Sequence, residues 1–459
     1  MRLKSLLLTI CFAVLAGWAI GQTVKVDGEI RPRAELRNGY KKLPGTDAKA
    51  AFAISQRTRF NAFYGSKLFK AYISMQDVRV WGDVNQLDKG DYNRFAIHQA
   101  WGEYFFNENF SFKVGRQELV YDDSRILGNV GWAQQARAHD LGLFKYEKNA
   151  LKIHFGLAFN QKHEGLAGTN YYAYQNPDGT YAFNKNYKAM QFIWVHTKIG
   201  ESGLSFLFLN NGMESATYTY DAESATTKAE FKTLYSQTIG ARFTPTLGPV
   251  KLATAVYYQM GKVAADTNSL SALYFALAGT FKVTDKFNVT GGFEYLSGRS
   301  LKDATENPDK LKSFTPLYGT NHKFNGHMDY FYVGNHGNSV GLVDIYATFK
   351  MKFGKLSIFA TPHYFMAAAD VYKVKAAPKS TFDEASYETM SKGLGIEVDL
   401  GMAYAPQKNM KFVLGLSEML GTETLGYIQG YSSTDAYSKN GAWAYVMFVF
   451  KPNFHKSDK

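Results

Sequence analysis

The sequence predicts an all-β protein: a transmembrane antiparallel β-barrel of about 18 strands (16–20), with short periplasmic turns and long extracellular loops. Three observations predict it: charged and apolar residues alternate with a period of two, short and long connectors alternate, and aromatic residues make up 16% of the 459 residues. The aromatic content excludes intrinsic disorder, and a single cysteine excludes a disulfide scaffold. Beyond the N-terminal segment no apolar run reaches about 18 residues, which excludes a polytopic helical membrane protein.

The first segment, Met1–Gly21, has the features of a cleaved secretory signal peptide. Two basic residues precede an apolar run from Leu6 to Ile20, and small residues stand before Gln22. A membrane-anchor helix is the alternative, but the run is short and no basic residue follows it directly. Cys11 lies too early for a lipoprotein signal. Cleavage removes this only cysteine and two of the basic charges, so the formal net charge falls from +12 to +10.

The mature chain opens with a strand in which one face is entirely charged. In Val24–Arg37 the even positions are apolar or small. Because successive side chains of a strand point to opposite faces, the odd positions share the other face. That face cannot enter a protein core without a large desolvation penalty, so it meets bulk water or lines a water-filled interior. Its residues are Lys25, Asp27, Glu29, Arg31, Arg33, Glu35 and Arg37.

The same alternation recurs in Ile54–Tyr64, Val340–Lys352 and Leu394–Tyr404. Ala442–Phe450 is apolar on both faces and is ambiguous by this criterion. The polar faces of these segments carry Arg57, Arg59, Asp344, Lys350, Lys352, Glu397 and Asp399.

The connectors indicate the architecture. Short and long connectors alternate strictly, which predicts consecutive hairpins with short turns at one rim and long loops at the other. Eight short and nine long connectors join 18 strands. The short ones are Gly65–Lys67, Asn107–Asn109, Glu147–Asn149, Gly200–Gly203, Thr244–Pro249, Thr284–Lys286, Phe353–Lys355 and Pro406–Asn409. The long ones are Arg37–Phe52, Asp77–Arg94, Tyr121–Gln134, Asn160–Tyr187, Asn210–Lys232, Gly261–Leu270, Ser297–Ser339, Ala367–Ser391 and Gly421–Asn440.

A closed barrel satisfies every backbone polar group in lipid, which only helices and closed barrels do. A soluble sandwich or propeller is the alternative, but it would bury the charged face and leave the one-sided loop lengths unexplained. The predicted organisation is a signal peptide at 1–21, an outer-membrane barrel at 22–451 and a polar C-terminal tail at 452–459. We expect both termini of the barrel chain to lie on the periplasmic side, where the short turns are. We expect the tail after Phe450 to be a disordered extension, with a binding element as the alternative.

A barrel of about 18 strands encloses an aqueous channel. The strand registers place arginines inward on two adjacent strands and Lys350 and Lys352 inward on a later one. Basic residues in a pore attract anions, and the planar guanidinium suits carboxylates. Glu29 and Glu35 are interleaved among them, so each single arginine is equally well explained as half of a wall-stabilising ion pair.

The densest motif is Gly115–Gly128, followed by Trp132, Gln134, Arg137 and Asp140. Together with Arg79–Asp83 and a second block, Phe314–Asp329, it resembles the alginate export family of outer-membrane barrels. The resemblance implies an 18-stranded barrel with an electropositive, arginine-lined pore that is partly occluded by loops and passes an anionic uronate polysaccharide. By matching position it implies pathway roles for Arg79, Arg116, Arg125, Arg137, Glu118 and Asp140. In the second block, His322, Lys323 and Asp329 are candidates for a loop constriction.

The sequence therefore predicts an anion-selective outer-membrane channel that passes an alginate-like uronate polysaccharide or its oligosaccharides by diffusion. A general porin for small anions is the alternative, and an outer-membrane enzyme or adhesin is a third. No motif groups a nucleophile with a histidine, and no P-loop or GxGxxG is present, so no catalytic residue and no cofactor are expected. His322, His327, Asp329 and His336 match no standard metal spacing, so no metal is expected. The expected partners are the anionic saccharide, outer-membrane lipid and possible periplasmic export proteins, with no nucleic acid.

Overall fold

The structure is a computed structural model that describes residues 22–458 apart from 88–94, 177–179, 184, 222–225, 333–335, 337–338 and 376–381. The predicted signal peptide, 1–21, lies outside the described residues. Among the helices of the described part, none is long and apolar enough to cross a membrane.

Eighteen antiparallel strands form a closed barrel, as the sequence predicts, because the first strand pairs with the last. They are β1 (Thr23–Asn38), β2 (Ala51–Gly65), β3 (Phe69–Val80), β4 (Phe95–Phe105), β5 (Phe110–Gln117), β6 (His139–Lys148), β7 (Leu151–Phe159), β10 (Ala189–Ile199), β11 (Ser202–Asp221), β12 (Thr226–Thr244), β14 (Val250–Val263), β15 (Ala265–Lys282), β16 (Phe287–Leu296), β18 (Leu342–Phe353), β19 (Leu356–Met366), β22 (Gly393–Gln407), β23 (Met410–Gly421) and β24 (Asn440–Phe450).

The connectors carry the remaining elements. Two small hairpins, β8–β9 and β20–β21, lie in long loops, and β17 pairs in parallel with β15. The bounds are β8 (Tyr172–Gln175), β9 (Tyr181–Phe183), β13 (Thr246–Leu247), β17 (Lys310–Leu311), β20 (Tyr372–Val374), β21 (Tyr387–Thr389), β25 (Asn453–Asp458), α2 (Leu301–Glu306), α3 (Glu423–Ile428), η1 (Asn321–Lys323), η3 (Glu384–Ser386) and η4 (Thr434–Ala436).

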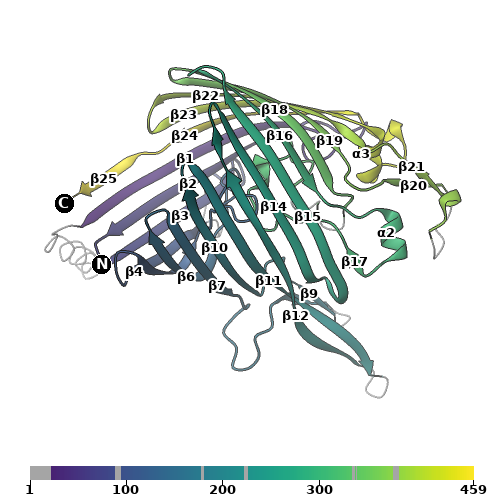
Figure 1. The fold of residues 1–459 in the computed structure, drawn as a ribbon, viewed down its shortest axis with the longest axis horizontal. Helices are drawn as coiled ribbons and strands as arrows, with labels where there is room; N and C mark the ends of the chain where they lie inside the picture. The colour runs from purple at the N-terminus through teal and green to yellow at the C-terminus, as the bar shows by residue number, and fades with distance from the viewer. Residues whose placement is uncertain are drawn as a thin grey trace.

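The two termini lie at one end of the barrel, and the long connectors with α2, α3 and β20–β21 lie at the other (Figure 1). Two predicted long loops differ from this pattern. The chain around Asn210–Lys232 continues as strands β11 and β12, which extend beyond the barrel as an arm (Figure 1). The stretch Gly261–Leu270 is a tight hairpin between β14 and β15. The Thr and Tyr residues of the first segment favour strands and lengthen its ladder, whereas the second segment turns at Ala264, whose φ is 65°.

Strand register gives the barrel an apolar outer face. In β1, Ile30 faces outward and is 40% exposed, whereas its neighbour Arg31 faces inward and is 7% exposed. Arg31 lies opposite Arg57 of β2, so the polar faces of both strands share the lumen. The outer face is apolar around the barrel, as lipid contact requires, and includes Phe60, Ile73, Leu157, Ile193, Phe206, Leu273, Ile345, Ile396, Leu400, Phe412 and Leu416.

Two long connectors pack against the inner face of the wall. One is the β5–β6 loop (118–138), and the other is the β16–β18 loop (297–341, with the gaps given above). Their apolar side chains form a core with inward residues of the strands, among them Leu119 and Phe314 from the loops and Phe192, Tyr274 and Trp443 from the wall. The sequence predicts a water-filled interior for the charged faces; in the structure these two loops cover much of them.

The C-terminal tail is ordered, contrary to the expected disordered extension. After Phe450 the chain continues into β25, which pairs with the first residues of β1, from Thr23 to Asp27. Phe454 stacks on Phe60 with ring centroids 6.0 Å apart. The tail therefore completes the ladder of β1 below the point where β24 ends, because the N-terminal half of β1 would otherwise be an unpaired edge.

Candidate functional site

The guanidinium of Arg31, on the inner face of β1, holds the β5–β6 loop against the wall. Its Nη1 donates to the carbonyl of Gly131 at 2.7 Å, and its Nη2 donates to the carbonyls of Trp132 and Ala133. Both Nε and Nη2 also donate to Oε1 of Gln134, at 3.1 and 2.9 Å. Gln134 in turn donates to Ser55 of β2. Arg31 is thus saturated by neutral acceptors of the loop.

Arg33 and Arg57 are buried beside it and are held in the same way. Arg33 pairs with Glu35 at 3.0 Å, donates to the carbonyl of Trp132 and lies 4.1 Å from the centre of the Trp132 ring. Arg57 pairs with Glu29 at 2.5 Å and donates to two loop carbonyls. These contacts make both arginines anchors of the β5–β6 loop. Their positive charges therefore contribute to the electrostatic potential of the lumen but do not contact a solute directly.

Arg59 and Glu118 meet where the β5–β6 loop leaves β5. Arg59 Nε donates to Gln76, and its Nη1 lies 3.9 Å from a Glu118 oxygen. Glu118 is also hydrogen-bonded by His98 at 2.7 Å and by Asn129 at 2.8 Å. Burial raises the pKa of Glu118, but these hydrogen bonds outweigh it and hold the pKa below its usual value. Glu118 therefore stays ionised beside Arg59.

A second part of the wall, formed by β16, β18 and β22, is acidic and lies beneath the β16–β18 loop; β22 is separated from β1 by β23 and β24. It carries four carboxylates, Glu294 on β16, Asp344 on β18, and Glu397 and Asp399 on β22, each no more than 4% exposed. The backbone amides of His327 and Met328 donate to Asp399 and Glu397. The Asn325 amide donates to Glu294 and Asp344, and His363 contacts Asp344 at 2.9 Å. The loop therefore supplies donors to every one of these carboxylates.

Arg125, from the β5–β6 loop, reaches this acidic wall. It is 1% exposed, pairs with Glu294 at 2.8 Å and donates to Asn325 at 2.9 Å. Arg125 therefore neutralises part of the charge of the acidic wall. Because it also contacts Asn325, it joins the β5–β6 loop to the β16–β18 loop.

The two blocks that carry the resemblance pair with each other in the lumen. Leu127 and Tyr318 form a parallel β-bridge, and backbone bonds join Gly128 to Tyr318 and Thr320 to Ser124 at 2.9 and 2.8 Å. A Cβ on Gly319 would lie 2.1 Å from the Arg125 carbonyl oxygen. Only glycine permits this close approach, which fixes one loop against the other.

Arg137 and Lys323 also join the two loops. Arg137 donates to the Gly319 carbonyl at 3.2 Å, and burial lowers its pKa. Lys323 Nζ donates to the Asp123 carbonyl at 2.8 Å but remains exposed. Of the two cations, Lys323 is the one that still faces solvent in the lumen.

Trp132 lies between the basic wall and the expected loop constriction. Its ring stacks on His322 of the β16–β18 loop with centroids 4.3 Å apart. The guanidinium of Arg33 contacts the same ring. His322 bonds Asp329 at 2.9 Å, and Asp329 also accepts from the Tyr40 hydroxyl. The chain of contacts from Arg33 to Tyr40 therefore links β1, both inward loops and the β1–β2 loop, and it brings together His322 and Asp329 as a junction between loops.

A cavity of about 510 Å³ lies against the acidic wall, below the tip of the β16–β18 loop. Aromatic rings line one part of it, Phe324, Tyr346 and Phe359, and polar groups line the rest. The polar groups include Lys323, Lys350, Asn325, His327, Thr348, Thr361, His363, Asp344 and Asp399. Its mixture of rings, hydroxyls, carboxylates and two ammonium groups is suited to a hydroxylated acid.

Lys350 and Lys352 face inward on β18 toward the short-turn end. Both are exposed, and no ion pair or hydrogen bond of either side chain is found within the described residues. The acidic residues of the lumen differ, since each carboxylate of the acidic wall is bonded to a donor. The exposed charge along this side of the lumen is therefore positive.

Arg79, Arg116 and Asp140 lie on the outer face of the barrel. Arg116 pairs with Asp140 directly across β5 and β6 at 2.7 Å, and each neighbours an inward residue, Gln117 or Leu141. Arg79 pairs with Asp77 on β3 at 2.6 Å. Strand parity puts these side chains opposite the lumen, so they have no part in the pathway proposed below.

Two residues that sequence reasoning passed over position the site. Asn325 links Arg125, Glu294 and Asp344, and its φ of 57° places it in the left-handed region. The pair Asn325-Gly326 is a turn signal that would have indicated a sharp loop tip. The alternation in Val340–Lys352 places Tyr346 on the same face as Asp344 and Lys350, but it does not mark Tyr346 as a residue that lines a cavity. Among the described residues, no group of three or more metal-ligating side chains is placed to hold an ion.

No family model matches the chain, and no curated protein matches it. Solved structures do. OccK9 (OpdG) of Pseudomonas aeruginosa has a TM-score of 0.58 at 11% identity, covering 94% of this chain and 98% of that one. OccK2 (OpdF) of the same organism, solved in complex with glucuronate, has a TM-score of 0.56 at 10% identity, covering 94% and 98%.

A BenF-like porin from Pseudomonas fluorescens Pf-5 has a TM-score of 0.57 at 10% identity, covering 94% and 99%. None of these structures is of an alginate export protein. The chain has the fold of these 18-stranded porins over nearly its whole length.

Proposed function

We propose that this protein is a passive outer-membrane channel for small anionic solutes, with sugar acids as the preferred class. The closed barrel with an apolar outer face supports a membrane location, and it shares its fold with solved porins. A barrel of this strand number is wide enough to contain a solute path beside inward loops.

One observation carries the proposal: Lys323, Lys350 and Lys352 are exposed in the lumen and have no carboxylate partner within the described residues, whereas the carboxylates of the acidic wall are bonded. Lys323 and Lys350 line the 510 Å³ cavity, and Lys352 follows on β18 toward the short-turn end. Exposed ammonium groups without a carboxylate partner, beside a low-dielectric wall, concentrate anions and repel cations. The buried arginines of β1 and β2 add to this field without binding the solute directly.

The cavity also favours a hydroxylated acid over a simple inorganic anion. The rings of Tyr346 and Phe359 offer apolar faces, while the half-buried Thr348 and His327 offer hydrogen-bonding groups for hydroxyls. A carboxylate at Lys350 would leave the rest of a sugar ring between these groups. The glucuronate held by the OccK2 structure is a solute of this class.

Ion selectivity in planar bilayers tests the proposal. In a KCl gradient the wild type should show an anion-selective reversal potential, and the Lys350→Gln, Lys352→Gln double variant should move that potential toward zero. Lys67→Gln with Lys148→Gln, two exposed lysines of short turns, removes the same charge away from the lumen and should leave it unchanged. A cation-selective wild type, or equal shifts in both double variants, would overturn the proposal.

The finer prediction is that an alginate-like uronate polymer passes through the channel. It can be tested by the dependence of binding on the length of the saccharide. The two loop blocks that resemble the alginate export family form the junction within the lumen, and a polymer must pass beside it. Blockage of chloride current by glucuronate and by oligouronates of increasing length separates the alternatives. A polymer channel would bind longer chains more tightly, a sugar-acid channel would saturate with the monomer, and a general anion porin would show no saturable block.

A further inference from the structure

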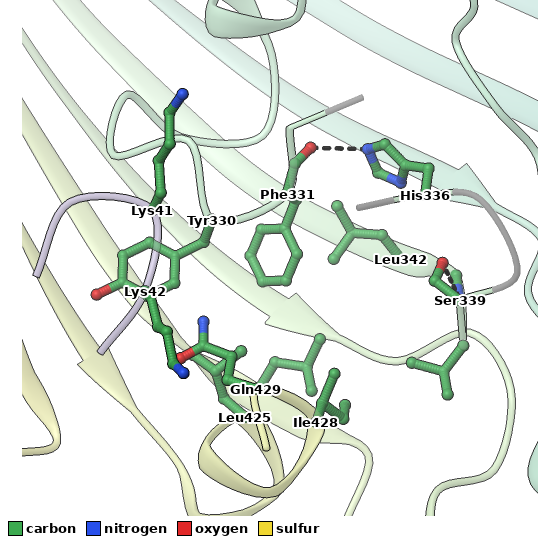
Figure 2. A pocket seen from close by; sticks show the side chains of 13 residues that line it. Lys41, Lys42, Tyr330, Phe331, His336, Ser339, Leu342, Leu425, Ile428 and Gln429 are labelled. Atoms are coloured by element: carbon green, nitrogen blue, oxygen red, sulfur yellow. Dashed lines mark hydrogen bonds between the residues drawn. The ribbon is translucent and has the colours of Figure 1, made fainter. Parts of the chain in front are cut away.

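A second cavity, which we name the rim pocket, lies at the long-loop end of the barrel. It has a volume of about 400 Å³ and lies between the β1–β2 loop (39–50), the β16–β18 loop and helix α3. Figure 2 shows Lys41 and Lys42 on one side of it and His336 and Ser339 on the other, with Leu425 and Ile428 of α3 along a third. It shares no lining residue with the 510 Å³ cavity of the lumen.

The floor of the rim pocket is apolar. Leu342, Leu394 and Leu425 form its base and are each no more than 2% exposed, so the apolar surface that remains accessible comes from the half-buried Phe331 and from Ile428, which is 41% exposed. An apolar group that enters displaces water from Phe331 and Ile428, which stabilises the complex by about 25 cal/mol for each Å² of apolar surface buried. The floor therefore favours a ligand with an apolar body.

The rim of the pocket is basic, and no acidic residue lines it among the residues that the structure describes. Lys41 and Lys42 are exposed, and none of the lining residues is Asp or Glu. The Lys42 ammonium lies 4.4 Å from the centre of the Tyr431 ring, and that of Lys41 lies 5.0 Å from the centre of the Tyr332 ring. Neither has a carboxylate partner within the described part of the chain. This charge complements a single anionic group.

The walls of the rim pocket are held in place without a ligand. The backbone amide of Lys41 donates to the Met328 carbonyl at 2.9 Å, and the Tyr330 hydroxyl donates to the Gly39 carbonyl at 2.6 Å. The amide of Leu43 donates to the Gln429 side chain at 2.9 Å. The three chain segments are thus tied to one another, so little conformational entropy is lost when a ligand binds.

We propose that the rim pocket binds an amphipathic monocarboxylate, such as an aryl-acetate, at the outer mouth of the barrel. The apolar body rests against Phe331 and Ile428, and the carboxylate lies at the rim, attracted by the ammonium groups of Lys41 and Lys42. Because this site is separate from the lysines of β18, it stands independently of the channel's ion selectivity.

Ligand-observed ¹⁹F NMR tests the proposal with the full-length protein in lipid nanodiscs and empty nanodiscs as the blank. The probe is 4-fluorophenylacetate, and its uncharged analogue is 2-(4-fluorophenyl)ethanol. We expect the acid to bind at least about fivefold more tightly than the alcohol. The Lys41→Gln, Lys42→Gln double variant should remove this difference while the alcohol binds as before.

Two further variants make the result specific to the pocket. Ile428→Asp places a carboxylate at a position that is 41% exposed, so it should weaken the acid more than the alcohol without disturbing the fold. Lys439→Gln removes a loop lysine that does not line the pocket and should leave both affinities unchanged. Equal binding of acid and alcohol to the wild type, or an acid affinity unaffected by the double lysine variant, would overturn the proposal whatever the bilayer recordings show.

Discussion

Replacing Arg31 by alanine should loosen the β5–β6 loop inside the barrel. Arg31 donates five hydrogen bonds to the loop, and the two shortest, to Gly131 and Gln134, measure 2.7 and 2.9 Å. Hydrogen bonds from a charged donor contribute about 1.5 kcal/mol or more each. Counting these two alone, the variant loses about 3 kcal/mol of anchoring, which shifts the equilibrium between docked and released loop roughly 100-fold.

The loop would remain partly attached, because Arg33 and Arg57 still donate to its carbonyls. We therefore expect brief excursions to higher conductance in single-channel recordings and greater open-channel noise, and no loss of the folded barrel. Arg31→Lys keeps the positive charge but loses the planar fork. It should show the same noise while retaining the wild-type reversal potential, which separates loop anchoring from the electrostatic field.

The matched control is Arg116→Ala, which removes an arginine on the outer face that pairs with Asp140. It should leave conductance and noise unchanged. Wild-type conductance and noise in Arg31→Ala would refute the anchoring role, and a change in Arg116→Ala would refute the inward and outward assignment of the strands.

Two further variants test the loop junction and the tail. Gly319→Val forces side-chain atoms against the Arg125 carbonyl, where even a Cβ would lie 2.1 Å from the oxygen. The variant should therefore separate the two loops and increase proteolysis within 118–138. Unchanged cleavage would contradict the junction. Deletion of 453–459 exposes the edge of β1 from Thr23 to Asp27 and should lower the temperature of heat-induced unfolding, measured by the gel shift of the folded barrel. The Lys451→Ala control should leave this temperature unchanged. A deletion without effect would mean that β25 adds no stability.

The strand pattern could be predicted because it is local. The charged face of β1 and the alternation of short and long connectors identify hairpins, and both follow from side-chain period and turn chemistry within a few residues. The same parity would have placed Arg79 outside, since it shares a face with Ile73, which is 47% exposed. For Asp140 parity alone is ambiguous, because β6 has apolar residues on both faces, Leu141 and Leu143 inward and Phe144 outward.

The roles of the inward arginines could not be predicted from the pattern. The partners of Arg31 lie 100 to 103 residues away in the chain, and no periodicity relates them. The pairing of the two loop blocks joins residues around Leu127 and Tyr318, which are still further apart. Such contacts depend on how a long loop folds back through the lumen, which is a property of packing and not of strand propensity.

By itself the sequence predicted about 18 antiparallel strands and the inward face of those strands in which charged and apolar residues alternate clearly, because a period of two and the connector lengths are properties of neighbouring residues. Only the tertiary structure decided which lumen charges are free to meet a solute. A guanidinium surrounded by loop carbonyls, as at Arg31, and an ammonium without a partner among the residues that the structure describes, as at Lys350, look alike in the alternation. They differ because an inward loop covers one and leaves the other exposed.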